Sequence, residues 1–189
     1  MAILHSAGRS WLAMHAILKK LSGGDRRSIG RSNEVVAEVL ARPALFRHVF
    51  DGLASENEVL RMRAADAAEK IAARRPELLR PFKRKLLALA GGTEQQEVRW
   101  HTALMIPRLD LTPRERGVAV DILFDYLRDR SSIVKTFAMH ALADLASKDS
   151  SLLTKILPLL EELTEIGTPA IRARGRKILQ HLNRQRAKA

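Results

Sequence analysis

The side chains that could hold a metal ion or move a proton are scattered along this sequence. No two histidines stand four residues apart, the spacing that places two imidazoles on one helix face, and we identify no carboxylate beside them in metal-site register. The chain has no cysteine, which excludes thiolate ligands and disulfides. We therefore expect no metal and no cofactor at the six histidines, which are His5, His15, His48, His101, His140 and His181.

Groups of residues typical of catalysis are also missing from the sequence. No glycine-rich phosphate-binding loop and no GxSxG nucleophile motif occurs. The neighbouring carboxylates of Glu161 and Glu162 point in different directions on a helix, so they cannot flank a substrate. Because no nucleophile is accompanied by a base and an orienting group, we predict a protein that is not an enzyme and has no evident small-molecule substrate.

A repeated amphipathic pattern organises the chain. An apolar residue followed by a base recurs at spacings of 38, 36 and 37 residues. We number each copy from this apolar residue, which we call the zero point, and give later positions as offsets from it. Further apolar residues stand at offsets 8 and 11 of each copy. Offsets 0, 8 and 11 share one helix face, so each copy predicts a helix with the same buried stripe, and a period of this length indicates stacked two-helix units. The four pairs are Leu60-Arg61, Val98-Arg99, Val134-Lys135 and Ile171-Arg172.

Capping residues support this register. Asn57, Ser131 and Thr168 each stand three residues before a zero point and are good N-caps. The run 112–115, Thr-Pro-Arg-Glu, combines an N-cap, a proline at the first helical position and a glutamate that can close a capping box. Pro107 is expected to end or kink the helix predicted over 94–109.

The N-terminal part is interpreted as an atypical first copy of the repeat. A helix over 10–21 is expected to stop at Gly23-Gly24, and Asp25 to open a second helix that runs to about Ala41, with Ile29 as its zero point. We predict one all-α domain over residues 1–189. Its approximate repeats are 1–41, 42–74, 75–110, 111–148 and 149–185, followed by a frayed tail at 186–189.

These helix pairs resemble a known family. The run 156–163, ILPLLEEL, looks like the first helix of a HEAT repeat with its tolerated proline. The runs 58–65, EVLRMRAA, and 97–99, EVR, look like the start of the second helix. The resemblance covers about residues 25–185. It implies a right-handed α-solenoid of about five antiparallel helix pairs. The aspartate usual in the family's turns is matched by Asp129 alone.

The resemblance also implies a function: a non-catalytic scaffold or adaptor that binds a macromolecule, most often a protein, through a concave face lined by the second helices. Offsets 2, 3, 6 and 10 of those helices are expected to point away from the core. An exposed Trp100 between Arg63 and Arg174 would suit a base or an acidic peptide; alternatively, Trp100 fills a gap between repeats. The candidate partner-binding residues are Arg63, Trp100, His101, Arg108, His140, Arg174 and Lys177.

The net charge of +12, from 33 bases and 21 acids, raises nucleic acid as the alternative partner, although the charge also serves solubility. The C-terminal pair is the most basic part and the better candidate for an anion contact, through Arg172, Arg174, Arg176, Lys177, Arg184 and Arg186. The bases Arg80, Lys83, Arg84 and Lys85 are interpreted as a solvated face. Some DNA alkylpurine glycosylases are built from HEAT-like repeats with tryptophans and an essential aspartate, but the residue four after Trp100 is Leu104. No apolar run is long enough to span a membrane, so we expect a cytoplasmic protein.

Overall fold

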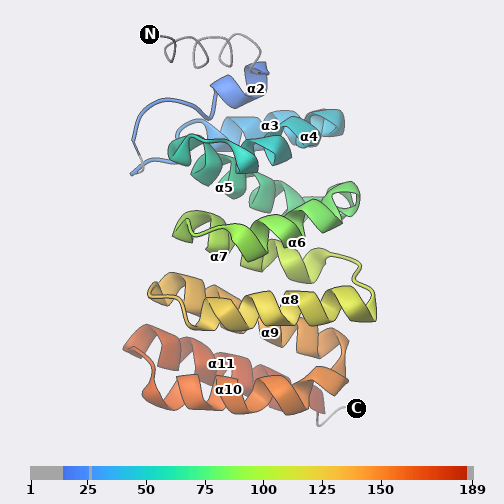
Figure 1. The fold of residues 1–189 in the computed structure, drawn as a ribbon, viewed down its shortest axis with the longest axis vertical. Coiled ribbons are helices and arrows are strands. Elements are labelled where there is room, and N and C mark those ends of the chain that lie inside the picture. Colours follow the sequence, from blue (N-terminus) through green and yellow to red (C-terminus); the bar gives the residue numbers. More distant parts are fainter. Residues whose placement is uncertain (1–14, 26, 187–189) are drawn as a thin grey trace, which may run out of the picture. The chain divides into compact units, whose positions relative to one another are not determined.

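The computed structural model describes residues 15–25 and 27–186, and this part of the chain is all-α (Figure 1). Its ten α-helices pack antiparallel to their neighbours along the chain. The chain divides into two compact units, Met1–Leu78 and Leu79–Ala189, and each is described in turn. The predicted all-α class is therefore confirmed.

The first unit contains four helices: α2 (Ala16–Lys19), α3 (Ser32–Ala41), α4 (Phe46–Asp51) and α5 (Glu58–Arg74). A 3-10 turn with Pro43 at its first position leads into α4. α5 contacts both α3 and α4, and apolar side chains from all three helices meet between them. This core includes Val35, Val36, Val39, Phe46, Val49, Phe50, Leu60, Ala64, Ala68 and Ile71.

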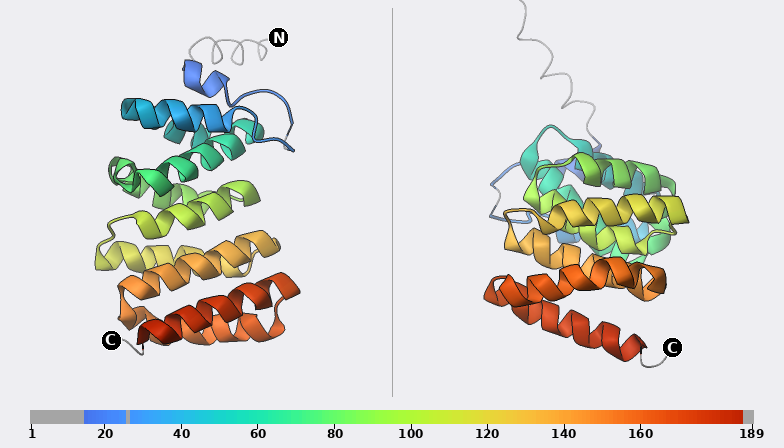
Figure 2. Two further views of the ribbon diagram at one scale, coloured as in Figure 1. Left: turned by 180° about the vertical axis from the view of Figure 1, so that it is seen from behind. Right: turned by 60° about the horizontal axis from the view of Figure 1, so that its bottom comes forward.

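The second unit consists of three helix pairs. α7 contacts α9 and α9 contacts α11, so these three helices form one layer. α6, α8 and α10 form a second layer packed against it (Figure 1). The layer of α7, α9 and α11 faces the viewer in the left view of Figure 2. The bounds are α6 Lys83–Gly92, α7 Gln96–Met105, α8 Pro113–Leu127, α9 Ser132–Lys148, α10 Leu153–Ile166 and α11 Pro169–Arg186.

The predicted buried stripe is present in all four copies of the repeat, although in the second copy offsets 8 and 11, Ile106 and Leu109, lie in the turn after α7. All four zero points are buried, and so are all four residues at offset 11. At offset 8 three of the four are buried, and the exception, Leu179, is half-buried. The 3.6-residue period therefore identified the core-facing side of each helix correctly. The zero points are Leu60, Val98, Val134 and Ile171.

The predicted caps are confirmed as well. The side chains of Asn57 and Ser131 accept hydrogen bonds from the backbone N–H groups of Leu60 and Val134. Thr112 and Glu115 form a reciprocal capping box at the start of α8, with proline at the first helical position. α7 ends at Met105, before a 3-10 turn that contains Pro107, because proline cannot donate the next helical hydrogen bond.

Two predicted helix starts were wrong. α3 begins at Ser32 instead of Asp25, and Ile29, the expected zero point of that copy, is 41% exposed in the preceding loop. The break at Arg75-Pro76 predicts a helix over 78–90, but α6 begins at Lys83, after a 3-10 stretch over Pro76–Phe82 that contains Pro81. Proline disfavours α geometry in the residue before it, which accounts for the late start of α6. The predicted start of the first helix, with Trp11, lies outside the described residues.

Candidate binding surface

Outward-pointing side chains from three successive helices of the second unit line one open depression of about 340 Å³. α7 contributes Leu104 at offset 6, and the turn after α7 contributes Arg108 at offset 10. α9 contributes the same two offsets, His140 and Asp144, and α11 contributes His181 at offset 10. Two of the predicted partner-binding residues, Arg108 and His140, are thus brought together by the fold. We refer to this feature as the central depression.

The polar groups of the central depression include an imidazole and a carboxylate that the sequence analysis failed to pair. His140 Nε2 lies 3.7 Å from Asp144 Oδ1, one helical turn along α9, and both side chains are close to half exposed. Asp144 stands four residues after His140, so the statement that no histidine has a neighbouring carboxylate in metal-site register overlooked this pair. Within the described residues, no group of three or more such side chains is arranged to hold a metal ion.

A second depression, of about 320 Å³, shares Arg108 and Lys148 with the first. Two of its cations are engaged inside the fold: the Lys148 ammonium donates to the Pro107 carbonyl, and Arg116 is paired with Asp149. The wall also carries Asp110. The charges here are largely balanced by local partners, so this depression offers a weaker anion site than its composition indicates.

Arg174 and Lys177 are exposed on α11, as predicted. They stand seven and four residues before His181, so all three lie on the same side of the helix as the central depression. Arg184, three residues further on, continues this line and is also exposed. Arg184 was predicted only as one of the bases of the C-terminal pair, and His181 was not predicted as a site residue, although the spacing of both from Arg174 was a usable signal. We refer to Arg174, Lys177, His181 and Arg184 as the cationic stripe.

Trp100 and His101 lie side by side on α7. Both residues are half-buried, and their ring centroids are 5.5 Å apart at an interplanar angle of 58°. Neither residue lines the two depressions described above. The expected arrangement of an exposed tryptophan ring flanked by the Arg63 and Arg174 guanidinium groups is wrong in one respect, because Arg63 is not exposed.

Arg63 is only 3% exposed and is enclosed by the loop between α2 and α3. Its guanidinium donates hydrogen bonds of 2.5–3.4 Å to backbone carbonyls. The loop approaches closely because Gly23, Gly24 and Gly30 have positive φ, and a Cβ on Gly30 would lie 2.8 Å from the guanidinium carbon. The prediction that Arg63 points away from the core is therefore wrong. The acceptors are the carbonyls of Leu21, Ser22, Gly23, Asp25 and Ser28.

The rest of the same face of α5 is covered by the start of α3. The Ser32 hydroxyl donates to Asp66 at 2.5 Å, and the Lys70 ammonium donates to Asp66 at 2.8 Å and to Asn33 at 3.0 Å. Asp66 was expected to point away from the core but is 8% exposed. Hydrogen bonds from Ser32 and Lys70 to the Asp66 carboxylate compensate for its loss of water.

Recurrence of a base at the repeat spacing indicates a structural role, and two of the four recurring bases, Arg61 and Arg99, have one. The Arg61 guanidinium donates to the Ser55 carbonyl at 2.7 Å, and Arg99 Nε donates to the Thr93 carbonyl at the same distance. Each acceptor lies six residues before the arginine, in the turn that leads into its helix. These arginines satisfy backbone oxygens that a turn would otherwise leave to water.

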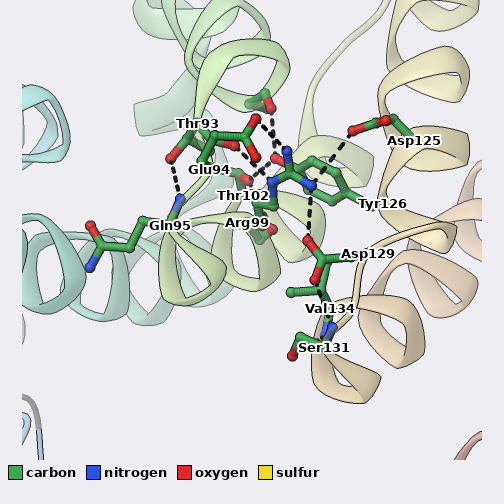
Figure 3. A network of polar contacts seen from close by, with 11 residues as sticks. Thr93, Glu94, Gln95, Arg99, Thr102, Asp125, Tyr126, Asp129, Ser131 and Val134 are labelled. Carbon is green, nitrogen blue, oxygen red and sulfur yellow. Dashed lines mark hydrogen bonds and ion pairs between the residues drawn. The ribbon is translucent and has the colours of Figure 1, made fainter.

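Arg99 also links two helix pairs of the second unit (Figure 3). Its guanidinium lies 2.8 Å from Asp129, the turn aspartate that the sequence analysis singled out, and 2.9 Å from Glu94. Arg99 and Asp129 have exposed side-chain fractions of 10% and 9%. The guanidinium carbon lies 5.1 Å from the ring centroid of Tyr126. This buried network holds α7 against the turn between α8 and α9 and presents no cation to a partner.

Tyr126 completes this network from α8. Its hydroxyl donates to the Ala90 carbonyl at 2.7 Å and lies 3.1 Å from the Thr102 hydroxyl. Burial raises the pKa of Tyr126 to about 12, because the phenolate would lose its hydration. The hydrogen bond with Thr102 and the charge of Arg99 act in the opposite direction on this pKa. The network is therefore stable as a neutral phenol beside a cation.

The chain was compared with protein-family models, with curated proteins and with solved structures, and none of the three comparisons found a match. In the described part of the chain, no helix combines the length and the apolar character needed to cross a membrane. The function is therefore inferred from the central depression and the cationic stripe of the second unit.

Proposed function

We propose that this chain is a right-handed HEAT-like α-solenoid that binds a macromolecule without catalysis of its own. A protein is the leading class of partner. The concave face of such a solenoid would be lined by the second helices, and in the second unit these are α7, α9 and α11. In this proposal the protein is a scaffold or adaptor. The outward-pointing side chains of the second helices determine which partner binds, and the buried stripe stabilises the fold.

One observation supports this proposal most directly. In the three repeat copies that contain α7, α9 and α11, the residues at offsets 0 and 11 are buried. The residues at offsets 6 and 10 of the first two copies and at offset 10 of the third line the central depression. A repeat that presents equivalent positions side by side on an open surface is suited to contacting an extended partner. The depression is open to solvent, and an open surface is less suited to enclosing a small substrate than a closed cavity is.

Site-specific photo-crosslinking tests this proposal. Benzoylphenylalanine replaces Asp144 in the central depression or, as a matched control, Val118, which is 47% exposed on α8. The proposal predicts a discrete adduct from position 144 in an extract of the source cells, suppressed by excess wild-type protein and absent from position 118. Equal labelling at both positions, or none at either, would contradict a binding function of this surface.

A nucleic-acid-binding module is the second candidate function. The observation that favours it is the exposed charge of α11, in which five described bases lack any acidic neighbour on the same helix. The glycosylase variant has no such support, because the residue one turn after Trp100 is Leu104 and the tryptophan itself is half-buried. The charge of α11 therefore bears on the chemistry of the partner and not on a reaction.

A further inference from the structure

The positive charge of the second unit is concentrated on its last helix. Residues 79–189 contain 20 arginines and lysines and 12 aspartates and glutamates, a net charge of +8. α11 holds six of these bases and none of the acids, so one helix contributes +6 of the +8. The preceding helix, α10, carries one base and three acids. The charge of α11 is therefore a local feature and not a general property of the surface.

The bases of α11 do not stabilise the described fold through polar contacts. In the described part of the chain, no hydrogen bond or ion pair involves the side chains of its first five bases, and all five are exposed. Three cations elsewhere in the unit are paired: Lys83 with Glu115, Arg99 with Asp129 and Arg116 with Asp149. The five bases are Arg172, Arg174, Arg176, Lys177 and Arg184.

These charges are also unfavourable for the helix that carries them. Arg172 and Arg176 are four residues apart, and Arg174 and Lys177 are three apart, so like charges face each other on the helix surface. The first turn of α11 contains no acidic residue to balance the positive end of the helix dipole. An anion bound along the helix would relieve this repulsion.

The cationic stripe is a straight line on the open side of α11. Ile171, Gly175, Ile178 and Leu182 are buried, which fixes the orientation of the helix. The stripe residues follow one another at intervals of three, four and three residues and extend over about 15 Å of helix axis, at 1.5 Å per residue. His181 connects the stripe to the central depression, where it lies with His140.

We infer that the cationic stripe of α11 binds the phosphate backbone of a nucleic acid. This inference rests on the proposed binding function of the α7, α9 and α11 layer, and it assigns the partner to the second candidate class, a nucleic acid, in place of a protein. The guanidinium groups of Arg174 and Arg184 can each form two hydrogen bonds with one phosphate, and Lys177 supplies a point charge between them. Contacts of this kind hold a strand in position without reading its sequence.

The composition of the stripe favours a nucleic acid over an acidic protein. Protein interfaces have an apolar or aromatic core around which polar contacts form a rim. Among the described residues, the exposed large apolar side chains are elsewhere, at Ile29, Val118, Ile133 and Ile166. A line of arginine, lysine and histidine without such an anchor matches the polar, positively charged interfaces that bind nucleic acids.

The test measures fluorescence anisotropy of a labelled DNA duplex with the full chain, over a series of salt concentrations. The stripe variant carries Arg174→Ala, Lys177→Ala and Arg184→Ala. The matched control carries Arg80→Ala, Arg84→Ala and Lys85→Ala, which removes the same net charge from exposed residues of the same unit. Circular dichroism melting establishes that both variants fold. Poly-L-glutamate serves as a competitor that carries carboxylates in place of phosphates.

We expect the wild-type protein to bind duplex with a steep salt dependence. Removing three phosphate contacts lowers the magnitude of the slope of log affinity against log salt by about 3 and weakens binding by more than about tenfold at low salt. The control variant is expected to keep the wild-type slope within about 1. Equal losses in both variants would overturn the inference, because net charge alone would then explain the binding.

Two further outcomes contradict the inference and separate it from the proposed function. No duplex binding at 50 mM salt, or competition by poly-L-glutamate as effective as that by unlabelled DNA at equal charge, excludes a phosphate-specific stripe. If the crosslinking at position 144 still gives a discrete adduct, the binding function stands and only its assignment to nucleic acid fails. If both experiments are negative, both proposals fail.

Discussion

Equivalent positions of the repeat are buried in the first unit and exposed to solvent in the second. On α5, the residues at offsets 3 and 6 are Arg63 and Asp66, and both are buried under the loop before α3 and the first residues of α3. On α11, offsets 3 and 6 are Arg174 and Lys177, and both are exposed. Offset along a helix determines the direction of a side chain relative to the core. Its exposure depends on what covers that direction.

The comparison also separates two uses of arginine. Arg63 is surrounded by carbonyl oxygens and stabilises a loop that contains three glycines with positive φ. Arg174 makes no polar contact within the described part of the chain. A guanidinium has five donors in a rigid fork, so it can organise several backbone oxygens at once or remain available for an anion. Substitutions at Arg63 and Arg174 should therefore differ in their effect on stability, and substitutions where α11 packs on its neighbours should affect the position of Arg174.

The largest expected effect is at Arg63. Arg63→Ala leaves several buried carbonyls without donors, and we expect it to lower the free energy of unfolding by about 3 kcal/mol, since hydrogen bonds to charged groups contribute about 1.5–3 kcal/mol. The matched variant Arg174→Ala, at the same offset of α11, is expected to change stability by less than about 0.5 kcal/mol. Urea unfolding followed by circular dichroism measures both. A larger loss for Arg174→Ala would reverse the comparison.

A smaller effect is expected at Gly175, where α11 packs against its neighbours. A Cβ at this position would clash with the Thr164 side chain of α10 and would lie 3.2 Å from Met139 of α9. We expect Gly175→Ala to lower the free energy of unfolding by about 1–3 kcal/mol through overpacking.

The control for this substitution is Gly117→Ala in α8. No atom lies within 4 Å of a Cβ built at Gly117, so alanine there is expected to stabilise the helix by up to about 1 kcal/mol. Thermal melting of the two variants should therefore shift in opposite directions. Stabilisation by Gly175→Ala would mean that α11 is not held as closely as the structure indicates, and the cationic stripe would lose its fixed position.

Tyr126 is the only tyrosine of the chain, so its ionisation reports on the second unit alone. We expect its absorbance near 295 nm to titrate at about pH 12 in the folded protein and near pH 10 after denaturation. A raised pKa means that the unfolded state releases its proton first. The contribution to stability is therefore complete below pH 10 and is lost as the pH rises toward 12. A folded-state midpoint near pH 10 would contradict the buried network around Arg99.

The smallest effect is expected in acid. The hydrogen bond from Lys83, together with the backbone N–H of Thr112, lowers the pKa of Glu115 to about 2. A lowered pKa stabilises the fold above the unfolded value near 4.5, and this contribution is lost as the pH falls toward 2. Glu115→Gln should make the stability between pH 5 and pH 2 less dependent on pH. An unchanged pH dependence, measured by urea unfolding at each pH, would mean that the capping box and Lys83 do not hold this carboxylate in solution.

Much of the architecture was predictable because helical periodicity is a local property. The buried stripe at offsets 0, 8 and 11 follows from 3.6 residues per turn, and it placed Val98, Val134 and Ile171 in the core correctly. The caps at Asn57 and Ser131 and the capping box at Thr112 require only neighbouring residues, so the sequence was sufficient for them as well.

The candidate site was predictable only in part. Arg108 and His140 line the central depression, and Arg174 and Lys177 lie on the cationic stripe, because their offsets direct them away from the core. Arg63 was assigned to the surface by the same rule and is buried. The rule cannot represent the loop before α3, whose three positive-φ glycines allow backbone to approach the guanidinium.

The sequence by itself therefore determined the helices, their caps and the side of each helix that faces the core, because these depend on residues within a few turns of one another. Only the tertiary structure decided which of the remaining faces stays open. That choice depends on contacts between segments up to 42 residues apart, such as those between Arg63 and Leu21. Burial of a charged side chain is stable only when several acceptors converge on it, and such convergence is a property of the folded chain.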